Sequence, residues 1–253
     1  MKDARIDLLE TYILDNKTVG IDELCNKLRV SKNTVRRYLN ELEKRGTVIK
    51  VYGGVKAVNS ADSQTPLSSF EDRHVARRAE KDYLCQLASE LVEDNDTVFI
   101  DTGTTCVKII EYIKELTCTI ITNSLQVANM SIPYEGLNII MLPGKLNRKT
   151  LSFVGMETIE NLRSLNVDKA FMASTGVTIE NGLTNASHEE YSIKKTVMSN
   201  SRSSYLLADY TKFGKTALRT YAKIENLDAL ITDQQPPQDI MDYCINHNVN
   251  VLF

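Results

Sequence analysis

The chain has 253 residues, 42% of them hydrophobic, and a formal net charge of −3. This length and composition allow a substantial hydrophobic core in one large or two unequal domains, and they exclude a disordered or fibrous chain. The slightly acidic balance argues against a protein that coats nucleic acid along its whole length.

The positive charge is concentrated near the N-terminus. Residues 1–57 hold 12 Lys and Arg against 8 Asp and Glu, whereas the rest of the chain holds 18 against 25. Within residues 31–56 the count is 7 against 2. This distribution is typical of a small nucleic-acid-binding head attached to an acidic body.

The cysteines and the N-terminus indicate the cellular setting. The five cysteines are odd in number and widely spaced, with no Cys-x-x-Cys pair, so we expect reduced thiols, no metal site and no cofactor. The N-terminus lacks an apolar signal core, and no apolar run is long enough to span a bilayer. We therefore expect a soluble cytoplasmic protein with no membrane partner.

The first 46 residues carry the pattern of three helices. Apolar residues recur at helical spacing between Asp3 and Leu14, and a short helix with acidic residues at its start is predicted for Asp22–Leu28. Ser31 is a good N-cap and Gly46 a good stop for a third helix of about four turns. Short polar and long cationic side chains crowd its first half, and Arg and Asn can make bidentate contacts to base edges. Taken alone, this third helix is equally compatible with a solvated charged helix.

The neighbouring segments favour DNA binding. Two short helices joined by the tight turn Arg29–Ser31 form a helix-turn-helix arrangement. Two β-prone segments around Gly53–Gly54 then predict a hairpin, which directly after a recognition helix is a wing. We predict a winged helix over residues 1–58 and a polar linker over 59–69. The candidate DNA-binding residues are Ser31, Lys32, Asn33, Thr34, Arg36, Arg37, Tyr38, Lys50, Tyr52 and Lys56.

Residues 70–253 have the pattern of an α/β domain. Helices are predicted for Phe70–Arg78 and Lys81–Val92, after which short apolar runs alternate with helices. Continuous apolar strands separated by helices indicate a mainly parallel sheet covered on both faces. The predicted strands are 97–101, 119–122, 137–142, 169–174, 204–208, 229–231 and 250–253, and the predicted helices between them include 107–116 and 125–130.

Small polar residues follow the predicted strands, where ligands bind in open α/β sheets. Free backbone N–H groups, hydroxyls and nearby cations at these turns suit an anion such as phosphate. The candidates are Asp101, Gly103, Thr104, Thr105, Thr122, Asn123, Ser124, Gly144, Lys145, Arg148, Thr175, Gly176, Glu190, Lys194, Asp209 and Lys212. Each also has a structural explanation, since Thr-Asn-Ser is often a helix cap and Gly-Thr-Thr an ordinary turn. Glu190 and Lys194 are four residues apart on a predicted helix, where a surface ion pair is the default interpretation.

These turns lack both the Walker sequence and the Gly-x-Gly-x-x-Gly fingerprint, which disfavours a nucleotide and favours a small phosphorylated sugar or polyol. The three histidines are scattered, and no catalytic constellation stands out.

In combination, these segments resemble the DeoR family of bacterial transcriptional regulators over nearly the whole chain. Residues 30–37, 42–46 and 52–55 are similar to its DNA-binding head, and 99–105, 121–124, 152–155, 168–171, 182–184 and 211–214 to its sensor half. The resemblance implies a C-terminal domain similar to ribose-5-phosphate isomerase and glucosamine-6-phosphate deaminase, used as a sensor of phosphorylated sugars. It also implies a homodimeric or homotetrameric repressor of operator DNA, released by an intermediate of the pathway it controls.

Three positions depart from the family pattern: Tyr38 stands where Asp is typical, Pro143 where Gly is frequent, and Cys106 where a small residue is frequent. Residues 22–25, 30–37, 51–55 and 152–157 look most similar to repressors of inositol catabolism. The rival hypothesis is a sugar-phosphate isomerase or deaminase with an accessory helical domain, and an activator instead of a repressor is a third alternative.

Overall fold

The computed structural model describes residues 6, 9, 12–13, 16, 18–28, 30–44, 48–51, 54–57 and 70–253. The chain divides into two compact units, Met1–Thr65 and Pro66–Phe253. The predicted linker 59–69 lies outside the described residues.

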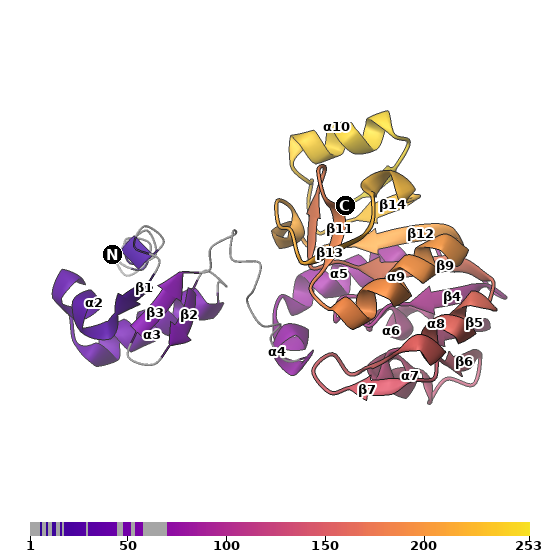
Figure 1. The fold of residues 1–253 in the computed structure, drawn as a ribbon, viewed down its shortest axis with the longest axis horizontal. Coiled ribbons are helices and arrows are strands. Elements are labelled where there is room, and N and C mark those ends of the chain that lie inside the picture. Colours follow the sequence, from indigo (N-terminus) through magenta and orange to yellow (C-terminus); the bar gives the residue numbers. More distant parts are fainter. Residues whose placement is uncertain are drawn as a thin grey trace. The chain divides into compact units, whose positions relative to one another are not determined.

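The first unit combines helices with a small antiparallel sheet (Figure 1). Its elements are β1 (Thr18–Gly20), α2 (Ile21–Leu28), α3 (Lys32–Lys44), β2 (Val48–Val51) and β3 (Gly54–Ala57), and the strand order is β1-β3-β2. From the first predicted helix, Ile6, Leu9, Tyr12 and Ile13 are described and helical. This arrangement confirms the predicted winged helix-turn-helix.

The core of this unit forms where α3 packs on the sheet and on the neighbouring helices. The helix α3 contributes four buried side chains to this core: Val35, Tyr38, Leu39 and Leu42. They pack with Leu9 and Ile13 and with Val48 and Val55 of the hairpin. Gly54 lies in β3, opposite Gly20 of β1, rather than in the hairpin turn as expected. A Cβ at Gly54 would lie 2.5 Å from the carbonyl oxygen of Val19, so the close approach of β1 requires glycine here.

The second unit is built on a seven-stranded parallel sheet. Its strands are β4 (Thr97–Ile100), β5 (Cys118–Thr122), β6 (Leu137–Met141), β9 (Val167–Ala173), β12 (Ser201–Leu207), β14 (Ala229–Ile231) and β15 (Asn250–Leu252). The order is β15-β14-β12-β9-β4-β5-β6. The chain runs from β4 to one edge through β5 and β6, then returns to β9 beside β4 and continues to the other edge. The direction of winding therefore reverses between β4 and β9, which is the topological switch point of the sheet.

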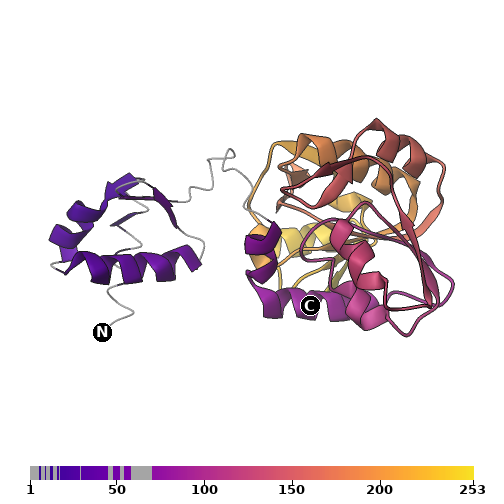
Figure 2. The same ribbon diagram turned by 90° about the horizontal axis from the view of Figure 1, so that it is seen from below.

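Helices cover both faces of this sheet, as predicted (Figure 2). They are α4 (Phe70–Val75), α5 (Arg78–Ser89), α6 (Ile109–Ile113), α7 (Leu125–Ser131), α8 (Met156–Arg163), α9 (His188–Asn200) and α10 (Gln238–Asn246). Residues of α8, α9 and α10 share one buried cluster with Phe99, and residues of α5, α6 and α7 share the other with Val98 and Ile100. Successive side chains of β4 thus alternate between the two cores, as a sheet buried on both faces requires.

Several details differ from the sequence expectation. The predicted helix 107–116 is only five residues long, because turns occupy residues 102–108 before α6 begins. The predicted helix Phe70–Arg78 ends at Val75, and Arg77 adopts a left-handed φ of 53° between α4 and α5. The pattern did not predict the hairpin β7 (Lys145–Asn147) and β8 (Ser152–Val154). It also missed the antiparallel sheet of β10 (Gly176–Thr178), β11 (Gly182–Asn185) and β13 (Arg219–Ala222), and the 3-10 helices η1 (Tyr210–Lys212) and η2 (Ile224–Asn226).

Candidate DNA-binding surface and effector site

The exposed face of α3 presents the groups that suit base readout. Ser31 caps the helix, since its hydroxyl accepts from the Thr34 backbone N–H at 3.3 Å. Asn33, Arg36, Arg37 and Asn40 are exposed and recur at helical spacing, opposite the buried stripe. Asn40 was not among the predicted residues, although its position seven residues after Asn33 places it on the same stripe.

Charge along α3 sets which part of the helix suits phosphate groups. Lys32, Arg36 and Arg37 lie in the first half, whereas the exposed Glu41 and Glu43 lie in the second. Lys32 makes an exposed ion pair with Asp22 of α2 at 2.6 Å. DNA phosphates are attracted to the N-terminal half, so the surface favours entry of α3 by its N-terminal turns.

Tyr38 was wrongly included among the candidate DNA-binding residues. Its side chain is only 4% exposed and packs in the core of the first unit. The guanidinium of Arg37 lies 5.7 Å from the centre of the Tyr38 ring. Tyr38 therefore supports α3 from beneath instead of contacting bases.

The predicted wing residues have different outcomes. Lys50 makes an ion pair with Glu43 of α3 at 2.5 Å, which joins β2 to α3. Lys56 lies in β3, but its side chain and the whole of Tyr52 lie outside the described residues.

In the second unit, several predicted effector residues meet at the switch point between β4 and β9. Asp101 follows β4 and is 2% exposed. Its backbone N–H donates to the Phe171 carbonyl at 3.0 Å, and its carboxylate accepts from the Ala173 N–H at 3.0 Å. A Cβ at Gly103 would lie 2.3 Å from the Cβ of Ala173, so only glycine allows the loop to approach β9 this closely.

Lys194 of α9 completes this centre. Its ammonium donates to the Asp101 carboxylate and, at 2.9 Å, to the Ala173 carbonyl oxygen. Burial lowers the pKa of Lys194, but the negative charges of Asp101 and Glu190 outweigh that effect, and the net shift is upward. Lys194 is thus held in its charged form as a buried partner of Asp101. The Tyr221 ring, 5.4 Å from the ammonium, forms one wall of this centre.

The default expectation of a surface pair between Glu190 and Lys194 was wrong. Both side chains are buried, Glu190 to 6% exposure, and Lys194 pairs with Asp101 instead. The Glu190 carboxylate accepts from Thr102 at 3.2 Å, from Ser152 at 3.0 Å and from Asn185 at 3.3 Å. The Glu190 carboxylate therefore holds together the loop after β4, strand β8 and strand β11 through three neutral donors.

A group of cations adjoins these carboxylates. Lys81 of α5 donates to the Thr104 hydroxyl at 3.0 Å and also to the backbone carbonyl of Arg73. Burial, followed by the charge of Lys212, lowers the pKa of Lys81 to about 8. Burial likewise lowers the pKa of Arg73, while the negative charges of Glu190 and Asp101 oppose that shift. The charges of Lys81, Arg73 and Lys212 and of the two carboxylates are therefore close enough to influence one another.

Asp209, which follows the end of β12, places a negative charge next to these cations. It lies 3.4 Å from the Nε atom of Arg77 and 3.9 Å from the ammonium of Lys212. The expectation that ligands bind beyond the ends of the strands identified Asp209 and Lys212. It did not identify Lys81, Arg73 and Arg77, which lie on or between helices before the sheet begins.

Other candidates occupy structural positions. Ser124 caps α7 by accepting from the Val127 N–H at 3.3 Å, and the Thr122 hydroxyl donates to the Ile100 carbonyl at 2.7 Å. The amide of Asn123 donates to the Phe153 carbonyl at 2.9 Å, which joins the loop after β5 to β8. The cap function named beside the ligand hypothesis thus accounts for the Ser124 bond, whereas Thr122 and Asn123 bond the backbone of β4 and β8.

The remaining candidates lie on or beside the two unpredicted antiparallel sheets, except Thr105, which lies in the turn after β4. Lys145 begins β7 and Arg148 lies in the following turn, and both are exposed. Gly144 precedes β7 with a φ of 146°. Thr175 bonds Asn185 at 3.3 Å, and Gly176 pairs with Thr184, so both belong to the small sheet beside the site. Thr105 is buried, and its carbonyl accepts from the Cys85 thiol.

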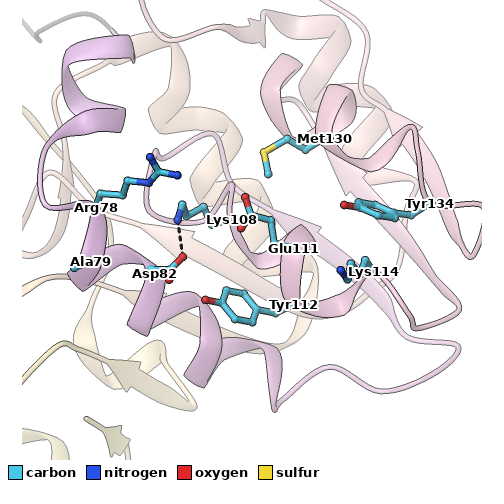
Figure 3. Close-up of a pocket in the computed structure, with 9 residues that line it drawn as sticks. All are labelled: Arg78, Ala79, Asp82, Lys108, Glu111, Tyr112, Lys114, Met130 and Tyr134. Atoms are coloured by element: carbon cyan, nitrogen blue, oxygen red, sulfur yellow. Dashed lines mark hydrogen bonds and ion pairs between the residues drawn. The ribbon is translucent and has the colours of Figure 1, made fainter.

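A separate cleft of about 940 Å³ lies between α5, α6 and α7 (Figure 3). Arg78, Lys108, Glu111 and Tyr112 are among its lining residues, and Lys108 crosses it to pair with Asp82 at 2.5 Å. None of the predicted effector residues lines this cleft. It is distinct from the strand-end centre.

Two further observations concern the described residues as a whole. No helix among them is long and apolar enough to cross a bilayer, and they contain no group of His, Cys, Asp and Glu arranged to hold a metal ion. The five cysteines are free, and all but Cys25 are buried.

A winged helix with a cationic recognition surface, joined in one chain to an α/β unit with a cationic strand-end centre, defines a ligand-responsive DNA-binding protein. Residues 5–61 match the DeoR-like helix-turn-helix domain, and residues 76–234 match the DeoR C terminal sensor domain. The chain belongs to the DeoR family and is a DNA-binding transcriptional regulator. This finding confirms the resemblance stated from the sequence.

Similar proteins span almost the whole chain. The HTH-type transcriptional regulator IolR of Bacillus subtilis is 42% identical over 252 residues, covering 99% of both chains. The HTH-type transcriptional repressor GlcR of the same organism is 31% identical, covering 99% of this chain and 96% of its own. Among solved structures, ribose 5-phosphate isomerase A from Methanocaldococcus jannaschii covers 53% of this chain and 54% of its own, with 21% identity and a TM-score of 0.40.

Proposed function

We propose that this regulator is a repressor of a sugar or polyol catabolic operon, and that a phosphorylated sugar or polyol bound at the switch point releases it from operator DNA. The observation that carries the proposal is the cationic group formed by Lys81, Arg73 and Lys212 beside the Thr104 hydroxyl. Cations and hydroxyls around a strand-end turn are the groups that recognise a phosphate.

The neighbouring polar network suits the rest of such a ligand. The Glu190 and Asp101 carboxylates lie close enough to Arg73 to affect its pKa, so they belong to the same site as the cations. Carboxylates accept hydrogen bonds from hydroxyl groups, whereas the cations favour phosphate oxygens. The site therefore combines an anion-binding side with a hydroxyl-binding side.

The relatives support a repressor of carbohydrate use. They include GlcR, the lactose phosphotransferase system repressor of Streptococcus mutans and the glycerol-3-phosphate regulon repressor of Escherichia coli. The similarity to IolR over nearly the full length supports the inositol-catabolism subgroup expected from the sequence. We also propose that the protein acts as a homodimer or homotetramer, because paired heads read repeated operator half-sites.

The rival function, turnover of a sugar phosphate, is less well supported by the geometry. Lys194 and Asp101 neutralise each other, and each also bonds the backbone of Ala173. A general acid or base must reach the proton that it transfers, so a pair held in this way favours binding without turnover.

Calorimetric titration with a panel of phosphosugars tests this proposal. One member of the panel is expected to bind the wild type, and Lys212→Ala is expected to bind it about tenfold or more weakly, as loss of a charged hydrogen bond predicts. Lys212 suits the test because its side chain is 32% exposed, so its removal is not expected to disturb the core. Failure of the whole panel to bind, or conversion of any member in a turnover assay, would contradict the proposal.

A further inference from the structure

Helix α4 is the first described element of the second unit, and it follows the chain segment that leads from the DNA-binding unit. Phe70 anchors it, being 4% exposed and part of the core shared with α5 and α6. His74 stacks on the Phe70 ring with centres 5.7 Å apart, and the Arg73 guanidinium lies 5.9 Å from the same ring. Phe70 therefore anchors α4 in the core of the second unit.

A second attachment of α4 passes through the effector site. The ammonium of Lys81 bridges the Thr104 hydroxyl, in the loop after β4, and the backbone carbonyl of Arg73, in the last turn of α4. Carbonyl groups in the last turn of a helix have no partner within that helix, so an outside donor stabilises them. Lys81, itself only 6% exposed, supplies such a donor from within the cationic group.

The Arg73 side chain brings α4 still closer to the site. Its guanidinium is partly buried, and it experiences the charges of both Glu190 and Asp101. The same residue thus offers its carbonyl to Lys81 and its guanidinium to the carboxylate side of the site. Any ligand that enters between these groups meets α4 directly.

We propose that Lys81 couples the effector site to α4: an anion bound at Thr104 draws the Lys81 ammonium away from the Arg73 carbonyl and loosens the helix. The inference rests on the proposed function, because it requires an anion at that site. A bond between the ammonium and an ionised phosphate oxygen is stronger than its bond to a neutral carbonyl, so an anion at Thr104 pulls the ammonium toward itself and lengthens the bond to Arg73. Effector binding would then act on the helix through which the sensor continues toward the DNA-binding unit.

The test is hydrogen–deuterium exchange of the full-length protein, followed in peptides that cover residues 70–78. Inorganic phosphate is the probe, with sodium chloride at equal ionic strength as control, and calorimetry on the same samples reports whether phosphate binds. We expect saturating phosphate to speed exchange in α4 about fivefold, the factor that corresponds to one typical hydrogen bond, while the loop after β4 becomes protected.

Variants identify the residue responsible. Lys81→Met is expected to show the faster exchange of α4 without phosphate and no further change with it. Lys114→Met, which removes an exposed lysine next to α6, is expected to behave as wild type. The comparison of wild-type exchange with and without phosphate needs no variant, so it tests the coupling even if Lys81→Met does not fold.

The outcomes separate the coupling from the proposed function. If phosphate binds but exchange in α4 is unchanged or slower, the coupling is wrong and the effector site stands. If phosphate and the phosphosugars all fail to bind, both are overturned. Unchanged exchange of α4 in a folded Lys81→Met variant would also overturn the coupling.

Discussion

Lys194 and Asp101, 93 residues apart in the sequence, form an ion pair in which both side chains are at most 4% exposed. The pair joins α9 to the end of β4 at the switch point of the sheet. It lies where α/β proteins bind ligands, so the stability of the sensor unit and the shape of the effector site depend on the same two charges.

The first prediction concerns the stability of this pair. Lys194→Met leaves the Asp101 carboxylate buried without its cation, and breaking a buried pair in this way costs about 3–5 kcal/mol. We expect a clearly lower free energy of unfolding in a denaturant titration followed by circular dichroism. Lys195→Met, which changes the exposed lysine next along α9, is the matched control and is expected to stay within about 0.5 kcal/mol of wild type.

Removing both charges extends this test. Asp101→Asn combined with Lys194→Met removes the carboxylate charge that the single variant leaves without its ion-pair partner, so the double variant is expected to regain part of the lost stability. Equal stability of Lys194→Met and Lys195→Met would show that the buried pair is not important for the fold.

The second prediction concerns the recognition helix. Arg36→Ala and Arg37→Ala each remove an exposed guanidinium from α3, and a good bidentate base contact is worth about 1–3 kcal/mol. We expect operator affinity to fall by about 5- to 150-fold in electrophoretic mobility shifts, with unchanged thermal unfolding. Lys223→Ala removes the same charge from an exposed site in the second unit and is expected to leave affinity unchanged. Wild-type affinity in either arginine variant would remove that residue from the readout.

The third prediction tests Asn40, which the structure adds to the recognition stripe. Its amide lies on the exposed face with Asn33 and Arg36, and an asparagine amide can bond both edge atoms of adenine. We expect Asn40→Ala to reduce the ratio of operator affinity to random-DNA affinity more than it reduces binding to random DNA. An unchanged ratio would assign Asn40 to a solvated face.

The fourth prediction is a pH dependence of anion binding. In the folded protein, the pKa of Lys81 is lowered to about 8 from the model-peptide value of 10.5. Between these two values the unfolded chain holds more protons than the folded one, so Lys81 makes stability rise with pH across that window. Anion binding needs the charged ammonium and is therefore expected to weaken as pH rises through about 8.

Sulfate is a suitable probe because its charge does not change over this range. Calorimetric titrations at increasing pH are expected to show the decline in the wild type and its absence in Lys81→Met. A wild-type affinity that stays constant across the window would contradict the assignment of Lys81 to the anion site.

The elements that local patterns determine were predictable from the sequence. The Ser31 cap and the apolar spacing of Val35, Leu39 and Leu42 are properties of one helix, and α3 spans Lys32–Lys44 accordingly. The apolar strand runs likewise gave the parallel sheet. In contrast, the β7–β8 hairpin has short strands of mixed polarity, so its pairing has little local signal.

Two wrong predictions, a DNA contact by Tyr38 and a surface pair of Glu190 and Lys194, could have been avoided from the helical spacing alone. Tyr38 is three residues after Val35 and four before Leu42, so the same spacing already placed it on the buried face. Glu190 and Lys194 share a helical stripe with Ile193 and Val197, which are buried. That stripe predicts a buried position for the two charges, which a surface pair cannot have.

Other parts of the site depend on contacts between distant segments. Lys81 and Arg73 reach the strand-end centre from helices that precede the sheet. Lys81 shares a helical stripe with the buried Leu84, Cys85 and Ala88, so its burial follows from the spacing, but the strand end that it reaches does not. The return of the chain to place β9 beside β4 also brings Lys194 next to Asp101. Such pairings follow from topology and not from local propensity.

The most direct test of the account is the affinity of the wild-type protein for DNA from upstream of its own gene and neighbouring operons, followed by fluorescence anisotropy as each phosphosugar is added. We predict tight, salt-dependent binding that one phosphosugar weakens, and we expect Lys212→Ala to bind the same DNA without being released by that sugar. No specific binding to any fragment, or binding that no phosphosugar changes, would contradict the account.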